Sequence, residues 1–319
     1  MGKLKEIELY NDFNELANDV LELATEILPD KLIYLTTFSN NQQIILKLSD
    51  TNTSILLTEG MAINIDQTAC NRIDFENNRP LIFNDTRESS CPSDLSNLLE
   101  SANIRSYMGL PISLVEGERF GTLCVAHHQE SYFDEKNIKL LQKIAKMFSY
   151  YLSLEYIAFR DPLTDLYNRR YLIKFFSIPS ATGGVLFSID LDGFKNVNDI
   201  HGHETGDFVL KEVAFRLKKI INEDKDDFAV RLGGDEFLVN FSQISSKENI
   251  RKKAEDILES LSKWNPEYQL SASMGIITYP QAQDLNLNVL LKNADDALYF
   301  AKKAGKNTYR FYEDLHELF

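Results

Sequence analysis

Residues 231–237 read RLGGDEF, a run that places two adjacent glycines directly before two adjacent carboxylates. The flanking segments, residues 228–232 and 237–239, are rich in β-prone residues. Two glycines between such segments predict a β-hairpin, because both can adopt positive φ without steric cost. The sequence therefore predicts a hairpin whose tip carries Asp235 and Glu236.

A second acidic site lies upstream, at the end of another predicted strand. Residues 185–189 read VLFSI, a buried-strand pattern, and residues 190–192 read DLD. Carboxylates at a strand end and on a neighbouring hairpin can hold a divalent cation against phosphate oxygens. The hairpin alone could also be an acidic, solvated turn. The polar segment between the two sites, DLDGFKNVNDIHGHETGD at residues 190–207, argues against that interpretation.

Together these motifs resemble the GGDEF family, the diguanylate cyclases that join two GTP molecules into cyclic di-GMP. Three further stretches agree with the resemblance: residues 161–170 read DPLTDLYNRR, residues 273–276 read SMGI and residues 301–307 read AKKAGKN. The similarity covers roughly residues 158–312. Five separated motifs in the family's order make it specific.

The resemblance implies a metal site and a reaction. It makes Asp190 and Asp235 the side-chain metal ligands and adds the backbone carbonyl of Leu191. Oxygen ligands of this kind suit Mg²⁺ or Mn²⁺. The 3′-hydroxyl of one GTP attacks the α-phosphate of the other while pyrophosphate leaves, so catalysis depends on charge stabilisation and in-line positioning.

Three residues are expected to be catalytic by the same resemblance. Asp235 also occupies the position of the general base, which we interpret as metal-assisted deprotonation of the 3′-hydroxyl. Glu236 orients the nucleophile or a second metal, unless its role is structural. Lys195 matches the residue that stabilises charge on the phosphates in the transition state.

Asn198 and Asp207 match the pair that reads guanine. A carboxylate accepts hydrogen bonds from guanine N1–H and N2–H₂, a donor face that adenine lacks. The pair therefore favours GTP over ATP.

The expected triphosphate contacts come from two further places. The resemblance places the turn glycines, Gly233 and Gly234, at the substrate. Lys302 and Lys306 match phosphate-contacting positions, and their spacing of four predicts one helix face. The family commonly has arginine at position 306, so lysine there loses a bidentate phosphate contact. We expect weaker or more metal-dependent triphosphate binding, with activity retained.

One departure from the family bears on regulation. Many members carry an Arg-x-x-Asp product-inhibition site shortly before the glycine turn. Here that window, residues 224–227, reads DKDD. Asp224 replaces the arginine that would bind product, so we expect no feedback inhibition through this site.

Composition sets broad limits. The length of 319 residues predicts about two domains. The net charge of −14 argues against nucleic-acid or anionic-membrane partners. No apolar stretch long enough for a membrane span and no signal sequence is present, so we expect a cytoplasmic protein. Cys70, Cys91 and Cys124 lack metal-ligand spacing. Ordinary reduced thiols are favoured over a redox or chromophore role.

The first half resembles a GAF domain, a small-molecule-binding sensor with a central antiparallel sheet and flanking helices, over residues 12–155. An amphipathic helix is predicted at residues 13–28 and a long helix at residues 133–155. Between them the sequence predicts strands at residues 32–38, 43–48, 54–57, 80–83, 106–114 and 121–127. A cyclic nucleotide is the expected ligand, contacted by residues 78–79, Phe83 and residues 85–86. The alternatives are an empty, purely dimerising domain or a bound tetrapyrrole.

The second half, residues 156–319, alternates strands with helices, and the resemblance implies a palm-like nucleotidyl cyclase domain. Strands are predicted at residues 184–190, 268–279 and 308–312, with the hairpin at 227–241. Helices are predicted at residues 205–221, 247–264 and 287–304. The fold class is therefore α/β (α+β) with two domains joined by the long helix.

That helix is predicted to continue through Arg160 and to stop before Pro162. Its apolar stripe predicts pairing with the same helix of a second subunit, so we expect a homodimer. The alternative is that the stripe packs on its own domain.

The favoured function is a GAF-regulated diguanylate cyclase that acts on GTP. One alternative is a non-enzymatic receptor for GTP or cyclic di-GMP. Another is a nucleotidyl cyclase that also accepts ATP.

Overall fold

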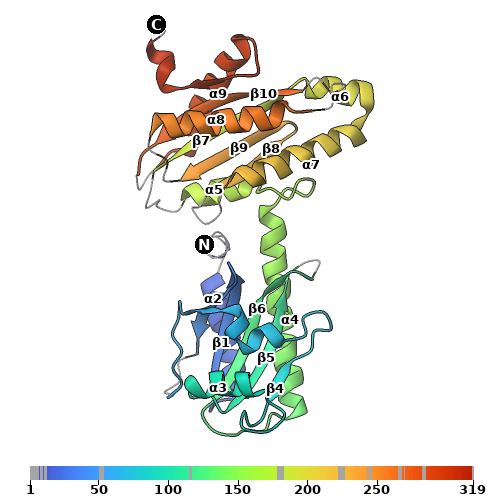
Figure 1. Cartoon of the computed structure of the whole chain (residues 1–319), viewed down its shortest axis with the longest axis vertical. Coiled ribbons are helices and arrows are strands. Elements are labelled where there is room, and N and C mark those ends of the chain that lie inside the picture. The colour runs from blue at the N-terminus through green and yellow to red at the C-terminus, as the bar shows by residue number, and fades with distance from the viewer. Residues whose placement is uncertain are drawn as a thin grey trace. The chain divides into compact units, whose positions relative to one another are not determined.

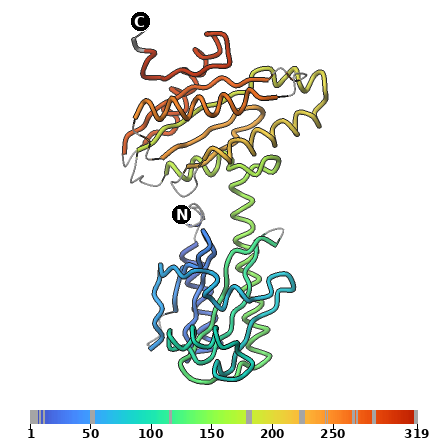
Figure 2. The backbone as a smooth tube through the Cα atoms, viewed as in Figure 1, coloured from blue at the N-terminus to red at the C-terminus, as the bar shows by residue number. Residues whose placement is uncertain are grey.

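The computed structural model of the chain describes residues 7, 10, 13–49, 54–114, 117–177, 183–221, 227–242, 244, 246–264, 268, 270–281 and 285–317. Figure 2 follows the backbone from the N-terminus to the C-terminus. The chain forms two compact units, which divide between Tyr156 and Ile157. Each unit has its own sheet and its own core.

The first unit is built on a six-stranded antiparallel sheet in the order β3-β2-β1-β6-β5-β4. Its strands are β1 (Leu32–Ser39), β2 (Gln42–Leu48), β3 (Ala62–Asn64), β4 (Leu81–Phe83), β5 (Ser106–Ser113) and β6 (Arg119–His127). The strand predicted at residues 54–57 is wrong. That segment joins no sheet; Leu56 N donates to Ala102 O instead, and Leu56 and Leu57 line a cavity.

Both faces of this sheet are covered. The helices α2 (Phe13–Ile27) and α4 (Glu135–Phe159) lie behind it in the view of Figure 1, and the Phe13 and Phe148 rings join them at 6.0 Å. The opposite face carries the helix α3 (Ser93–Ser101) and the short 3₁₀ helices η1 (Ile65–Gln67) and η2 (Ala69–Arg72). The core on this face includes Tyr34. Because neighbouring residues of a strand point to opposite faces, β1 is buried along most of its length.

The second unit contains a five-stranded sheet in the order β11-β10-β7-β9-β8, with β10 and β11 parallel and the other pairs antiparallel. Its strands are β7 (Gly184–Asp192), β8 (Phe228–Gly233), β9 (Glu236–Ser242), β10 (Ser271–Tyr279) and β11 (Tyr309–Phe311). Its helices include α5 (Arg169–Ser177), α6 (Phe194–His201), α7 (His203–Ile220), α8 (Lys247–Ser262) and α9 (Leu287–Lys303). A 3₁₀ helix, η5 (Glu313–Glu317), ends the described chain.

Helices cover this sheet too. Apolar residues of α7 and α8, among them Val213 and Ile257, share one core with Phe187 of β7. Figure 1 shows α8 crossing the front of the sheet. The helix α9 approaches β10 closely, since a Cβ added at Gly275 would lie 2.0 Å from Ala294 O. Only glycine permits this approach, which fixes the position of α9 and of Lys302 in its last turn.

The junction between α4 and α5 is held by Asn168. Its Nδ2 donates to Ala158 O at 2.9 Å and to Arg160 O at 3.1 Å, which satisfies carbonyls at the end of α4. Its Oδ1 accepts from Arg170 N at 2.9 Å and from Tyr171 N at 3.2 Å, which caps α5. One asparagine therefore orders the end of one helix and the start of the next.

The predicted fold class is confirmed: the chain is mixed α/β with two sheets, and the first is antiparallel with flanking helices. Some helix limits differ from the predictions. The helix α4 ends at Phe159 rather than Arg160, and the helix predicted at 205–221 begins at His203 and follows the separate helix α6. In the described part of the chain, no helix is both long and apolar enough to cross a membrane.

Candidate functional site

The two acidic motifs meet at one end of the second sheet. Strands β7 and β9 are antiparallel, and their register sets Asp190 opposite Glu236. The turn that precedes Glu236 consists of Gly234 and Asp235, not of the two glycines as predicted, because a register shift lets Gly233 pair with Glu236. Both glycines do have positive φ, 149° for Gly233 and 54° for Gly234. A Cβ added at either would meet no atom within 4 Å, so the space around them is open.

Asp235 and Asp190 lie close enough for their charges to interact. Burial and the negative charge of Asp190 raise the pKa of Asp235, against the opposing effects of Lys302 and Arg231. Asp190 is ion-paired with Lys302, whose Nζ lies 2.7 Å from Asp190 Oδ2. A nearby cation favours the ionised form of two neighbouring carboxylates, and the Lys302 ammonium group serves Asp190 in this way.

This donor set fits a hard divalent cation. Among the residues the structure describes, no cluster of three His, Cys, Asp or Glu side chains has metal-site geometry, so the protein side chains on offer are the two carboxylates. Leu191 pairs with Ala272 of β10 but has no partner residue on β9, where the ladder ends at Asp190. Mg²⁺ usually binds one or two carboxylates and keeps its remaining positions for water and substrate phosphate. The residues present therefore fit Mg²⁺ or Mn²⁺.

Arg231 ties the turn to the segment that follows α4. Its Nε and Nη2 donate to Gly234 O at 3.0 and 2.9 Å, and its Nη1 donates to Asp161 Oδ1 and Oδ2 at 3.0 and 3.2 Å. Burial opposes ionisation of Asp161, but hydrogen bonds from Thr164 and Arg231 outweigh it and lower the pKa of Asp161. A planar guanidinium is suited to two such contacts at once. These contacts fix the Gly234 carbonyl relative to Asp161.

Asn198 and Asp207 come from neighbouring helices. Asn198 is half-buried on α6, and a Cβ added at Gly206 would lie 2.0 Å from its Oδ1. The Asn198 side chain therefore rests on the backbone of α7 one residue before Asp207, which is exposed. The glycine at 206 is what allows the Asn198 side chain to lie against α7.

The three lysines expected to contact phosphate lie in different kinds of local structure. Lys195 is exposed in the first turn of α6, which follows Gly193 at φ 86°. Lys302 lies in the last turn of α9, but Lys306 lies beyond the helix. Gly305, Lys306 and Asn307 all have positive φ, 112°, 65° and 46°. The prediction that Lys302 and Lys306 share a helical face is therefore wrong, because the chain leaves the helix after Lys303.

Asp192 holds this end of the sheet together, a role the sequence did not indicate. It is buried; its carboxylate accepts from Ser271 Oγ at 2.9 Å, from Ser273 Oγ at 2.9 Å and from Asn307 N at 3.1 Å. It thereby anchors the segment that carries Lys306. Asp190 and Asp192 are two residues apart and so lie on the same face of β7, and this spacing could have indicated that Asp192 also acts at this end of the sheet.

Part of the expected product-inhibition window lies outside the described residues, including Asp224. Asp227 is described and buried, and its Oδ1 accepts from Ser242 N at 2.9 Å. This contact joins the start of β8 to the end of β9.

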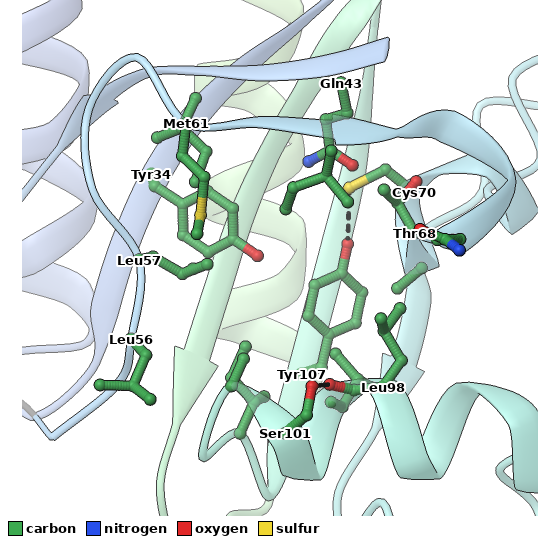
Figure 3. Close-up of a pocket in the computed structure, with 17 residues that line it drawn as sticks. Tyr34, Gln43, Leu56, Leu57, Met61, Thr68, Cys70, Leu98, Ser101 and Tyr107 are labelled. Atoms are coloured by element: carbon green, nitrogen blue, oxygen red, sulfur yellow. Dashed lines mark hydrogen bonds between the residues drawn. The ribbon is translucent and has the colours of Figure 1, made fainter. Parts of the chain in front are cut away.

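A cavity of about 330 Å³ lies in the first unit (Figure 3). Aliphatic side chains make up most of its wall, and the polar groups of Tyr34, Gln43, Cys70 and Tyr107 face it. Among the described residues that line it, none is Asp, Glu, Lys, Arg or His. Gln43 is buried, and its Oε1 has no hydrogen-bond partner in the described part of the chain.

The residues expected to line a ligand pocket lie elsewhere. Asn78, Arg79, Phe83, Asp85 and Thr86 do not line this cavity. Asp85 Oδ2 instead pairs with Arg105 Nη2 at 3.0 Å. Thr86 Oγ1 donates to Ile104 O at 3.3 Å. The residues expected at the ligand lie in or near β4, whereas the cavity is lined mainly by apolar residues of β2, α3, η2 and the connecting loops, together with Tyr34 of β1 and Tyr107 of β5.

Comparison with known proteins places both halves in families. Residues 158–308 match the family described as "Diguanylate cyclase, GGDEF domain", and residues 12–152 match the GAF domain family. The chain is 27% identical over 321 residues to diguanylate cyclase DgcP of Escherichia coli (strain K12), a match that covers 91% of this chain and 89% of that protein.

Two further matches are confined to part of the chain. The probable diguanylate cyclase DgcT of Escherichia coli (strain K12) is 34% identical over 195 residues, covering 56% of this chain; the match spans only 42% of that relative. A solved structure of the coiled coil and GGDEF domain of DgcB from Caulobacter crescentus in complex with c-di-GMP is 23% identical, with a TM-score of 0.49. It covers 55% of this chain and 97% of that one.

Proposed function

Because residues 158–308 of this chain belong to the diguanylate cyclase GGDEF family and residues 12–152 to the GAF family, we propose that the protein is a ligand-regulated diguanylate cyclase. It condenses two GTP molecules into cyclic di-GMP with release of two pyrophosphates. The sensor domain spans residues 12–155 and the cyclase domain residues 156–319.

One observation carries this proposal: Asp190, Asp235 and Lys302 converge at the end of β7, beside a turn that leaves open space. In our proposal Asp190, Asp235 and the Leu191 carbonyl hold Mg²⁺ or Mn²⁺. When bound, that cation neutralises phosphate charge and eases deprotonation of the 3′-hydroxyl.

The chain's own groups bind and orient the substrate. Lys302 pairs with Asp190 in the structure, and with a cation bound at that carboxylate its ammonium group would be available to the triphosphate. Lys306 adds a second positive charge, and Lys195 faces the charge that builds on the transferring phosphate. Asp235 and Glu236 act at the nucleophile, Asp235 as the acceptor of the 3′-hydroxyl proton.

Recognition of guanine falls to Asn198 and Asp207. The Asp207 carboxylate accepts from N1–H and N2–H₂, while the Asn198 amide binds the opposite edge. The backbones of Gly233 and Gly234 approach the phosphates, since neither glycine carries a side chain into the open space there.

Two active sites must face each other, since each subunit binds one GTP, so the enzyme acts as a homodimer. The helix α4 offers the contact surface. Met147, Tyr150, Leu154 and Ile157 recur at alternating spacings of three and four residues and are 56–71% exposed. That spacing is the a/d pattern of a two-stranded coiled coil, and such a stripe is costly to leave in water.

The cavity of the first unit is the proposed ligand site, but its chemistry argues against the cyclic nucleotide expected from sequence. A cyclic nucleotide carries a phosphate charge, and the described part of the lining offers no cation to balance it. We propose an uncharged, mainly apolar ligand with a hydrogen-bond donor for Gln43 Oε1.

Incubation of the full-length protein with GTP and Mg²⁺, followed by mass spectrometry of the products, tests the cyclase proposal. We expect cyclic di-GMP and pyrophosphate, with no cyclic product from ATP alone. Binding of GTP without any product would indicate a receptor instead. A cyclic product from ATP at a similar rate would overturn the assignment of Asn198 and Asp207.

A further inference from the structure

Two of the three cysteines lie side by side in the core of the first unit. Cys70 comes from η2 and Cys124 from β6, and their Sγ atoms are 3.5 Å apart. Both side chains are buried. Cys91 lies apart from them; its Sγ contacts Pro92 O at 3.8 Å.

The pair sits among polar groups that stabilise a thiolate. Tyr107 Oη lies 3.1 Å from Cys70 Sγ and 3.4 Å from Cys124 Sγ. Thr122 Oγ1 donates to Cys70 Sγ at 3.2 Å and lies 3.1 Å from Cys124 Sγ. Two sulfurs and two hydroxyl oxygens thus lie together inside a largely apolar core.

These contacts make the two sulfurs unequal. Burial opposes ionisation of Cys70, but hydrogen bonds from Cys124, Thr122, Tyr107 and Gln43 outweigh it and lower the pKa of Cys70 to about 7. Burial, together with the hydrogen bond and charge of Cys70, raises the pKa of Cys124. Cys70 is therefore the nucleophile near neutral pH, and Cys124 remains a thiol.

Access to the pair is also unequal. Cys70 lines the cavity, whereas Cys124 is not among the described residues of its wall. Figure 3 shows the Cys70 sulfur between the Gln43 amide and the Tyr107 hydroxyl. Leu56 and Met61 line the same cavity and are exposed, so the cavity opens to the surface. The cavity is large enough to admit hydrogen peroxide, and Cys70 forms part of its wall.

We propose that Cys70 and Cys124 form a peroxide-oxidisable thiol pair that closes into a disulfide at the wall of this cavity. The Cys70 thiolate attacks one peroxide oxygen; an S–O bond forms, the O–O bond breaks and hydroxide leaves. The Cys124 sulfur then attacks the Cys70 sulfenic acid; an S–S bond forms, the S–O bond breaks and water leaves with the Cys124 proton. Two thiols lose two electrons in total, and one hydrogen peroxide becomes two waters.

The reaction changes the cavity as well as the cysteines. The Sγ atoms must close from 3.5 Å to about 2.05 Å, which draws η2 toward β6. Because η2 contributes Ala69 and Cys70 to the cavity wall, oxidation alters the surface a ligand meets. The link to cyclase control rests on the proposed function, but the disulfide is detected without any cyclase assay.

Peptide mass spectrometry of the reduced full-length protein after exposure to hydrogen peroxide and alkylation tests the proposal. We expect a cross-linked peptide containing Cys70 and Cys124, formed at least about tenfold faster than Cys91 is oxidised and reversed by dithiothreitol. Free thiols at Cys70 and Cys124 after this treatment, or oxidation of Cys91 at the same rate, would overturn it.

Two variants separate the roles of the sulfurs. In Cys124→Ser we expect Cys70 to accumulate as a sulfenic acid that dimedone traps. The matched control, Cys91→Ser, should form the cross-link at the wild-type rate. If Cys124→Ser does not fold, Cys124→Ala serves the same purpose. Dimedone labelling of Cys91 but not of Cys70 would contradict the assignment of Cys70 as the nucleophile.

Discussion

Arg231 is the residue that joins the turn carrying Asp235 to the segment that follows α4. It holds Gly234 O with two nitrogens and Asp161 with the third, so the carbonyl next to Asp235 has a fixed position. Small displacements of catalytic groups are costly to rate, because the attacking and leaving oxygens must stay in line. The contact is therefore expected to matter for turnover more than for GTP binding.

Replacing Arg231 by lysine should show this. Lysine keeps the charge but cannot hold both partners at once, so we expect kcat to fall about 10- to 100-fold with little change in KM. Steady-state pyrophosphate release measures both constants. The control is Arg216→Lys, since Arg216 binds Ser260 O and Lys263 O in the same unit. Equal losses in the two variants would show that Arg231 has no particular role in positioning.

Lys306 gives a second prediction at this scale. It stands in a left-handed conformation after Gly305, beside Asn307, whose N–H is held by Asp192. Lys306→Arg restores a planar group that binds phosphate with two hydrogen bonds, so we expect KM for GTP to fall about two- to tenfold at unchanged kcat. Lys303→Arg, at an exposed position on α9, should change neither constant. A KM that does not fall would mean that residue 306 does not contact the triphosphate.

At the scale of elements, the helix α4 holds the residues of the proposed dimer contact, and it also connects the first unit to the second along the chain. Its exposed stripe consists of four apolar side chains, those of Met147, Tyr150, Leu154 and Ile157. A charge introduced in the middle of a coiled-coil seam is buried without a partner, which opposes association.

We therefore expect Leu154→Glu to produce monomers with at least about tenfold less cyclase activity per chain. Analytical ultracentrifugation and product formation measure the two effects. Leu23→Glu is the matched control, since Leu23 is an exposed leucine on α2 of the same unit. A Leu154→Glu protein that stays dimeric and active would exclude the stripe as the dimer contact.

The sequence predicted the long elements well and the short ones poorly, for physical reasons. The strand β7 contains a continuous apolar run and the helix α8 has helical periodicity, and each pattern made its element clear. The helix α6 is short and rich in Asn and Asp, so its propensity is low; it forms because Phe194 and Val197 are buried. Lys306 shows the same limit, since spacing alone could not indicate where α9 stops.

The sites were predictable to different degrees. The proximity of Asp190, Asp235 and Lys302 could be predicted because each lies in a recognisable motif, while the roles assigned to these residues stay predictions. The cavity was missed because its lining is ordinary core residues from distant segments, such as Tyr34 and Leu99. Nothing in their local sequence distinguishes a residue facing a cavity from one facing solid core. The Cys70–Cys124 contact was missed for the same reason, since 53 residues separate the two in sequence.

For the whole molecule, control is expected at the sensor rather than at the catalytic domain. The segment that we expected to hold a product-inhibition site has Asp224 at the position where we expected arginine. An acidic side chain repels the product's phosphates. An intact enzyme of this kind should therefore keep synthesising cyclic di-GMP as product accumulates.

Product inhibition of the full-length protein tests this expectation. Initial rates with added cyclic di-GMP should equal those without it, apart from competition at the GTP site. Asp224→Arg should introduce inhibition that excess GTP does not relieve, because arginine supplies the phosphate contact. Strong non-competitive inhibition of the unaltered protein would show that product binds at a regulatory site that needs no arginine at position 224.

One cation, held jointly by Asp190 and Asp235, is the feature on which the proposed chemistry depends. Electron paramagnetic resonance of Mn²⁺ bound to the full-length protein with 3′-deoxy-GTP, which cannot react, measures this directly. We predict one protein-dependent Mn²⁺ site per chain, weakened at least about tenfold by Asp190→Asn or Asp235→Asn and unchanged by Asp199→Asn on the exposed side of α6. Wild-type Mn²⁺ affinity in both carboxylate variants would contradict the joint site.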